Sequence, residues 1–74
     1  MIFFTEHSLL KLKHRKISKN LVFEAIENPD YVLESYSDRE IVYKKFGKFY
    51  LKVIYREEFK NIIIITQYWT KTVK

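Results

Sequence analysis

Four side chains suited to phosphate chemistry lie close together in the N-terminal third of the chain: His7, Lys11, His14 and Arg15. Residues three, four, seven and eight positions apart share one side of an α-helix, so a helix here would align all four. An imidazole exchanges protons near neutral pH, and fixed cations beside it stabilise a charged phosphodiester. The spacing therefore indicates a site that binds or cleaves a phosphodiester. The alternative is a solvated cationic helix face, which small basic proteins often carry.

A second group of candidate side chains lies in the C-terminal half. Lys52 and Arg56 fall on one side of an expected strand, where they would complete a cationic cleft with the helix residues. Ordinary exposed strand charges are the alternative. Thr66 and Tyr68 share one face of the last strand, where a hydroxyl and a phenol would orient a nucleophile or stack on a base. Lys71 follows on the C-terminal tail as a further phosphate contact.

The aromatic residues of the expected strands allow two interpretations. Tyr43, Tyr50, Tyr55 and Trp69 would either stack on unpaired bases or pack against neighbouring strands. Packing is the commoner use of aromatic residues in strands, so we favour it here.

No metal site and no cofactor are expected. The chain has two histidines, no cysteine and scattered carboxylates, which give no constellation of metal ligands. His7 and His14 are two helical turns apart, too far to share a zinc ion. The only glycine, Gly47, belongs to an expected hairpin, so no glycine-rich phosphate loop is present.

Length and charge narrow the class of protein. With 74 residues, the chain fits one domain with one modest core over residues 1–74. Its formal net charge of +5 and pI of about 9.5 favour a polyanionic partner, most often nucleic acid. An anionic membrane surface or an acidic protein is the alternative. No apolar run is long enough for a membrane span and residues 1–4 do not resemble a signal peptide, so we expect a cytoplasmic protein without a membrane partner.

The N-terminal half predicts two helices. Thr5 is the expected N-cap of the first, which should end near Arg15 or Lys16. Ser18 is the expected N-cap of the second, and the pair 28–29 should end it because the residue before proline avoids the helical region. The expected buried side of the first helix consists of four apolar residues: Leu9, Leu10, Leu12 and Ile17.

The remainder predicts four strands, at residues 31–36, 41–46, 49–56 and 62–69. Turns are expected at 37–38 and 47–48, a loop at 57–61 and a basic tail at 70–74. Short turns join antiparallel neighbours, so the fold class is α+β, with two N-terminal helices packed on one face of a four-stranded antiparallel β-sheet. An exposed edge strand would pair either with a partner segment or with a second copy of the chain.

Three short motifs give the chain a resemblance to a known family. In the first, a helix opens with a histidine and is followed by basic residues and an Ile-Ser pair, as in His7, Lys11, Arg15 and Ile17-Ser18. The second is an apolar helix that ends in Asn28-Pro29, and the third is Thr66-Gln67-Tyr68 with Lys71 nearby. In these residues the chain resembles the RelE/ParE-like toxin superfamily, and more narrowly the domain-of-unknown-function family 4258. Lys16 departs from the pattern, because the usual glycine suits a left-handed helix end that lysine adopts at a cost.

The resemblance implies a RelE-like toxin of a toxin–antitoxin pair that cuts RNA without a metal, by attack of the ribose 2′-hydroxyl on the adjacent phosphate. The implied catalytic residues are His7 as general acid/base, Arg15 as phosphate clamp, and Tyr68. The residues expected to bind RNA phosphates are Lys11, Lys52, Arg56, Thr66 and Lys71. The implied partners are RNA, on the ribosome for many relatives, and a cognate antitoxin protein. The alternative is a non-catalytic basic module of the same fold that binds RNA or an antitoxin.

Overall fold

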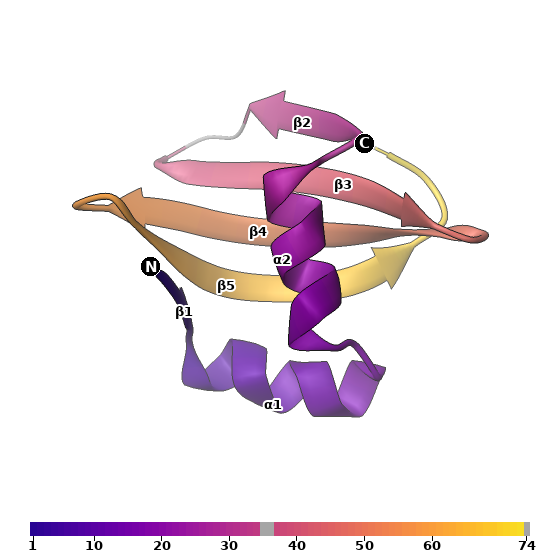
Figure 1. Ribbon diagram of the computed structural model, residues 1–74, viewed down its shortest axis with the longest axis horizontal. Helices are drawn as coiled ribbons and strands as arrows, with labels where there is room; N and C mark the ends of the chain where they lie inside the picture. Colours follow the sequence, from indigo (N-terminus) through magenta and orange to yellow (C-terminus); the bar gives the residue numbers. More distant parts are fainter. Residues whose placement is uncertain (35–36, 74) are drawn as a thin grey trace.

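Within residues 1–34 and 37–73, which this computed structural model describes, the chain forms a five-stranded mixed sheet and two helices (Figure 1). Along the chain the elements are β1 (Ile2–Phe4), α1 (Glu6–Arg15), α2 (Lys19–Glu27), β2 (Tyr31–Glu34), β3 (Arg39–Phe46), β4 (Phe49–Glu58) and β5 (Asn61–Thr70). The strands lie side by side in the order β1-β5-β4-β3-β2. The predicted α+β class is therefore confirmed.

The predicted four-stranded antiparallel sheet is wrong, because it lacks β1. This strand pairs in parallel with β5, with Ile2 opposite Ile62 and Phe4 opposite Ile64. The pairs among β2, β3, β4 and β5 are antiparallel, as expected. With three residues, β1 is too short for alternation to show in the sequence, and its partner lies at the far end of the chain. Parallel pairing is sterically allowed because the rest of the chain connects the two strands.

The helix ends follow the predicted capping residues. The Oγ1 of Thr5 accepts a hydrogen bond from the backbone N–H of Ser8 at 3.1 Å, and Ser18 accepts one from Leu21 in the same way. Lys16 ends α1 in the left-handed conformation, with φ 54° and ψ 50°. A residue with a Cβ adopts that conformation at a cost of roughly 1–2 kcal/mol. Lys16 thus takes the backbone geometry that favours glycine.

Two of the predicted turns agree with the structure, and the connection between β4 and β5 is shorter than predicted. The turns at 37–38 and 47–48 are confirmed, and Ser37, Asp38 and Gly47 have positive φ. The predicted loop at 57–61 is wrong in extent, because β4 continues to Glu58 and β5 begins at Asn61. Only residues 59 and 60, both with positive φ, form the turn between them. The last two residues of the predicted first strand, 35 and 36, and residue 74 of the predicted tail lie outside the described residues.

The two helices contribute differently to the core. α2 lies across the sheet over β3 and β4, whereas α1 lies along its β5 margin beside β1 (Figure 1). The buried core combines residues of both helices, of the segment between them and of three strands: Leu12, Ile17, Val22, Ala25, Val42, Leu51, Val53 and Ile64. The predicted burial of Leu9 and Leu10 is wrong, since 43% and 54% of their surfaces are exposed. A helix at the margin turns only one narrow side toward the protein.

A buried polar pair holds α1 against β5. The hydroxyl of Ser8 donates to Oε1 of Gln67 at 2.6 Å, and Nε2 of Gln67 donates to the backbone carbonyl of Ser8 at 3.0 Å. Neither residue is exposed to solvent. Buried polar groups must be satisfied internally, so these two bonds fix both the height and the rotation of α1 on the strand.

A β-bulge in β5 changes which face of the sheet its residues occupy. The register with β4 shifts between Ile64 and Thr66, which leaves Ile65 without an opposite residue. The backbone N–H of Thr5 donates to the carbonyl of Ile64 at 3.2 Å, and its Oγ1 donates to that of Ile65 at 3.4 Å. The extra residue lets Ile64 enter the core while Thr66 points to the opposite face, although the two are an even number apart.

Removal of the Ser8 hydroxyl tests how firmly α1 is fixed. Ser8→Ala leaves the side-chain carbonyl of Gln67 buried without a donor, so we expect the free energy of unfolding to fall by about 1–3 kcal/mol. Urea unfolding followed by circular dichroism measures the change. The double variant Ser8→Ala/Gln67→Leu is the control, because it leaves no unpaired amide and should recover part of the loss. Equal stability of Ser8→Ala and the wild type would show that the pair does not hold the helix.

Candidate nucleic-acid interface

The face of the sheet turned away from α2 carries tyrosines and basic residues beside a row of apolar residues, Leu33, Ile41 and Ile54. Strand register and alternation place seven side chains together on it, and we call this set the open face: Tyr31, Tyr43, Lys45, Tyr50, Lys52, Thr66 and Tyr68. Within the described part of the chain, no helix lies over this face (Figure 1). The open face therefore has to cover the sheet with its own side chains.

Ammonium groups lie over the tyrosine rings of the open face. The Nζ of Lys52 is 5.4 Å from the ring centroid of Tyr43 and 5.4 Å from that of Tyr68. The Nζ of Lys45 is 5.8 Å from the centroid of Tyr50. All three distances are within the range of a cation–π interaction. The rings thus hold the two cations in place above the sheet.

Contacts between rings extend this arrangement toward the β2 edge. The rings of Tyr43 and Tyr50 meet edge to face at 6.5 Å, and those of Tyr31 and Tyr50 at 6.0 Å. Tyr43 is almost fully buried, with 1% of its surface exposed, whereas Tyr31 on the edge strand is largely accessible. Tyr43 therefore packs the centre of the open face, and Tyr31 and Tyr50 offer surface to a ligand.

Arg15, from the last turn of α1, completes the open face at the opposite end. Its Nη1 donates to the backbone carbonyl of Gln67 at 2.8 Å and to Oγ1 of Thr66 at 3.3 Å, and its Cζ lies 5.6 Å from the ring centroid of Tyr68. The carbonyl of Gln67 is accessible at this margin because β1 pairs only with residues 62–64 of β5. The guanidinium thus caps the unpaired part of the strand edge.

These contacts form one continuous chain, which we call the tyrosine–cation row: Arg15, Tyr68, Lys52, Tyr43, Tyr50, Lys45 and Tyr31. It runs from the α1 margin across β5, β4 and β3 to β2. Cations bind phosphates, and tyrosine rings stack on bases without regard to their identity. The row can therefore bind a flexible polyanion that carries flat rings.

The two tyrosines keep the ammonium of Lys52 charged. Partial burial lowers the pKa of Lys52, but hydrogen bonds to Tyr68 and Tyr43 raise it by more, so its pKa lies above the ordinary value of 10.5. Lys52 is thus a fixed cation in the middle of the row at any physiological pH.

The predicted residues of α1 divide between its two ends. Arg15 lies in the row, whereas His7 is exposed in the first turn, about 12 Å away along the axis at about 1.5 Å per residue. Lys11, between them, is half-buried, and His14 is exposed. The structure therefore brings the predicted clamp into the row and leaves the predicted acid/base at the far end of the helix.

The predicted residues of the strands divide in the same way. Thr66, Tyr68 and Lys52 lie within the row or against Arg15. Arg56 is on the same side of β4, but its Nε is 2.8 Å from a carboxylate oxygen of Glu58, which offsets its charge. Lys71 is exposed beyond the end of β5. Lys52 thus lies in the row, whereas Arg56 pairs with Glu58.

Sequence reasoning missed Lys45 and Tyr31 as members of this site. The available signal was the spacing of Lys45 two positions after Tyr43 on an alternating strand. Their relation to Tyr50 depends on the register of three strands, which no local pattern encodes. The favoured packing role holds for Trp69 and Tyr55, which lie against the core on the helix side.

Metal binding and membrane insertion are two other uses that a small domain can have. Among the described residues, no three His, Cys, Asp or Glu side chains lie close enough together to hold a metal ion. Neither helix in the described part of the chain is long and apolar enough to cross a membrane.

Comparison with known proteins gives one match. The model of the family described as "Domain of unknown function (DUF4258)" matches residues 4–69. The matched range includes both helices, the open face and Arg15. No curated protein and no solved structure matches the chain.

Alkaline unfolding tests the environment of Lys52. A pKa raised in the fold contributes stability that is complete below the unfolded value of 10.5 and is lost as the pH rises through the folded pKa. We therefore expect the wild type to lose stability above about pH 10.5, and Lys52→Met to lose less.

Tyr55→Phe is the control for this measurement, since burial, then Glu40 and Glu57, also raise the pKa of Tyr55 above 10.0. Ionisation of Tyr55 also lowers the stability of the fold at alkaline pH. Comparison of the two variants therefore separates the effect of Tyr55 from that of Lys52. Urea unfolding at a series of pH values gives the slopes. An identical slope for Lys52→Met and the wild type would contradict the assignment.

Proposed function

We propose that this chain, which belongs to the DUF4258 family, binds single-stranded RNA across its open face and cleaves it where the tyrosine–cation row meets Arg15. The observation that carries the proposal is the row itself. It combines three cations and four tyrosine rings on one surface, which are the partners that the phosphates and bases of a single strand need. A net charge of +5 adds long-range attraction for a polyanion.

The proposed cleavage uses three side chains at the Arg15 end. The ribose 2′-oxygen forms a bond to the adjacent phosphorus while the bond from phosphorus to the 5′-oxygen breaks, which leaves a 2′,3′-cyclic phosphate and a 5′-hydroxyl. The proton of the 2′-hydroxyl passes to solvent water, and the phenol of Tyr68 delivers a proton to the leaving 5′-oxygen. The ring of Tyr68 lies between the guanidinium of Arg15 and the ammonium of Lys52. Arg15 and Lys52 stabilise the extra charge on the phosphorane.

The motif resemblance and the arrangement of two helices against a sheet support a role as a RelE-like toxin. In that role the target is messenger RNA, on or off the ribosome, and an antitoxin protein neutralises the activity. The basic surface suits an acidic antitoxin segment.

A second candidate is a module of the same fold that binds RNA without cleaving it. The position of His7 favours this alternative, because its imidazole is exposed about 12 Å along α1 from Arg15. Proton transfer within the row then depends on Tyr68. The two candidates share the binding surface and differ only in the fate of the RNA.

Binding is tested with a fluorescently labelled oligouridine and a change of one cation. Lys52→Met removes a phosphate contact while keeping the aliphatic stem, so we expect the Kd to rise about tenfold. The slope of log Kd against log salt should decrease by about 0.7. Lys13→Met is the matched control, because Lys13 is an exposed lysine of α1 outside the row and its loss should change the Kd less than about twofold. If Lys52→Met and Lys13→Met weakened binding equally, the effect would be due to net charge alone, and the open face would be rejected as the RNA-binding surface.

Cleavage is tested with Tyr68→Phe, which keeps the ring and removes the hydroxyl. We expect the cleavage rate to fall about 10²–10⁴-fold while the Kd stays within about twofold. End-labelled messenger RNA, in a translating extract and free with chelator, gives the rates and the cyclic-phosphate ends. His7→Ala run in parallel decides whether the imidazole takes part, since unchanged cleavage would remove it from the mechanism. Intact RNA with the wild type would leave the binding module as the function.

A further inference from the structure

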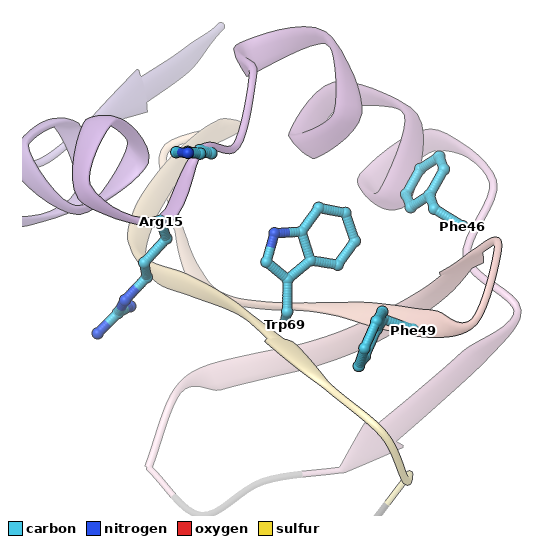
Figure 2. Close-up of a pocket in the computed structure, with 5 residues that line it drawn as sticks. Arg15, Phe46, Phe49 and Trp69 are labelled. Atoms are coloured by element: carbon cyan, nitrogen blue, oxygen red, sulfur yellow. The ribbon is translucent and has the colours of Figure 1, made fainter.

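A cavity of about 500 Å³ opens on the helix side of the sheet, beside the β3–β4 hairpin. Five residues line it, and we call it the Trp69 pocket: Arg15, Lys16, Phe46, Phe49 and Trp69. Figure 2 shows the indole of Trp69 between Arg15 on one side and the two phenylalanine rings on the other. The volume lies in the range of pockets that hold one small molecule or one residue of a larger ligand.

The Trp69 pocket is aromatic at one end and is bounded by two basic residues at the other. The rings of Phe46 and Trp69 meet edge to face at 6.2 Å and 89°. Phe49 is 42% exposed at the rim. Lys16 and the side-chain stem of Arg15 complete the lining. This chemistry fits a flat ring joined to an anionic group, as in a nucleotide.

Lys16 occupies the left-handed end of α1 at the rim of the pocket. Lys16 has φ 54°, a conformation that glycine adopts without steric cost and lysine does not. Replacement of Lys16 by glycine therefore removes its charge without straining the helix end.

Arg15 connects the Trp69 pocket to the tyrosine–cation row. It lines the pocket, yet its guanidinium points away from the indole, toward the carbonyl of Gln67 and the ring of Tyr68 (Figure 2). A strand leaving the row at Arg15 reaches the pocket by passing around the β5 margin. This continuity favours a nucleotide over the side chain of an unrelated acidic peptide.

We infer that the Trp69 pocket receives one nucleotide of the same RNA strand, with its base among the aromatic rings and its phosphate at Lys16, while the guanidinium of Arg15 stays in the row. The inference rests on the proposed RNA binding by the open face and adds a second subsite on the other side of the sheet. It also sets the path of the strand, which crosses the open face and then turns around α1's C-terminal end.

The chain has a single tryptophan, so its fluorescence reports on this pocket alone. An oligouridine long enough to extend beyond the open face should quench Trp69, because a base stacks near the indole. An abasic sugar–phosphate strand of the same length should not. Anisotropy of the labelled strands records binding at the same time, independently of the tryptophan signal.

Two variants keep the test independent of folding. Lys16→Gly removes the ammonium and relieves the backbone strain, so it should fold at least as well as the wild type, and the salt slope should fall by about 0.7. Phe49→Ala should weaken binding about fivefold to hundredfold and reduce the quenching. Phe59→Ala is the matched control, because Phe59 is 97% exposed in the β4–β5 turn and should change neither signal.

The outcomes separate this inference from the proposed function. Quenching by the oligouridine that is lost in Phe49→Ala supports the subsite. Tight binding by anisotropy, weakened by Lys52→Met but with no quenching and no effect of Phe49→Ala, overturns the subsite and leaves RNA binding by the open face intact. Quenching by a glutamate-rich peptide carrying one phenylalanine, but not by the oligouridine, overturns it in favour of a protein partner. Absence of any RNA binding overturns both proposals.

Discussion

The pair of hydrogen bonds between Ser8 and Gln67 is the constraint on which the rest of the site depends. It sets the height of α1 on β5, and Arg15 lies two turns further along the same side of that helix. The carbonyl of Gln67 then accepts from Arg15, and Tyr68, the next residue, carries its ring on the other face below the guanidinium. Gln67 thus holds α1 through its side chain, and its backbone carbonyl positions the guanidinium of Arg15. A small shift of α1 would break both contacts.

Local features of the fold were predictable, and those that depend on distant pairing were not. The caps at Thr5 and Ser18 and the hairpin at Gly47 follow from residue chemistry over a few positions, and all three are confirmed. Strand β1 and its parallel pairing depend on contact with the other end of the chain. The exposure of Leu9 and Leu10 has the same origin, because helical periodicity predicts a face but does not say whether a sheet covers it. The assignment to α+β survives because it needs only the order of the elements.

In the candidate site, too, the features that depend on one strand were predictable, and those that depend on the register between strands were not. Alternation along single strands placed Lys52 on one face of β4 and Thr66 and Tyr68 together on β5, and the structure joins these two groups with Arg15. The register across β2, β3 and β4, which adds Tyr31 and Lys45, has no local signature. Helical spacing put His7 and Arg15 on one side of α1 but not at one point, since eight residues span about 12 Å. Two residues on the same side of a helix can therefore lie far apart. Residues opposite each other on paired strands lie close together, so strand pairing is the better evidence for a common site.

The tyrosines of the open face also show that packing and ligand binding are not alternatives here. A sheet face without a helix must bury its own backbone, and Tyr43 does so beneath Lys52 and Tyr50. Each ammonium in turn rests on a ring, at 5.4–5.8 Å, so the cations are positioned before any ligand arrives. Such preorganisation lowers the entropy that binding has to overcome. The contacts that pack this face of the free protein are thus the same ones that hold its cations in place.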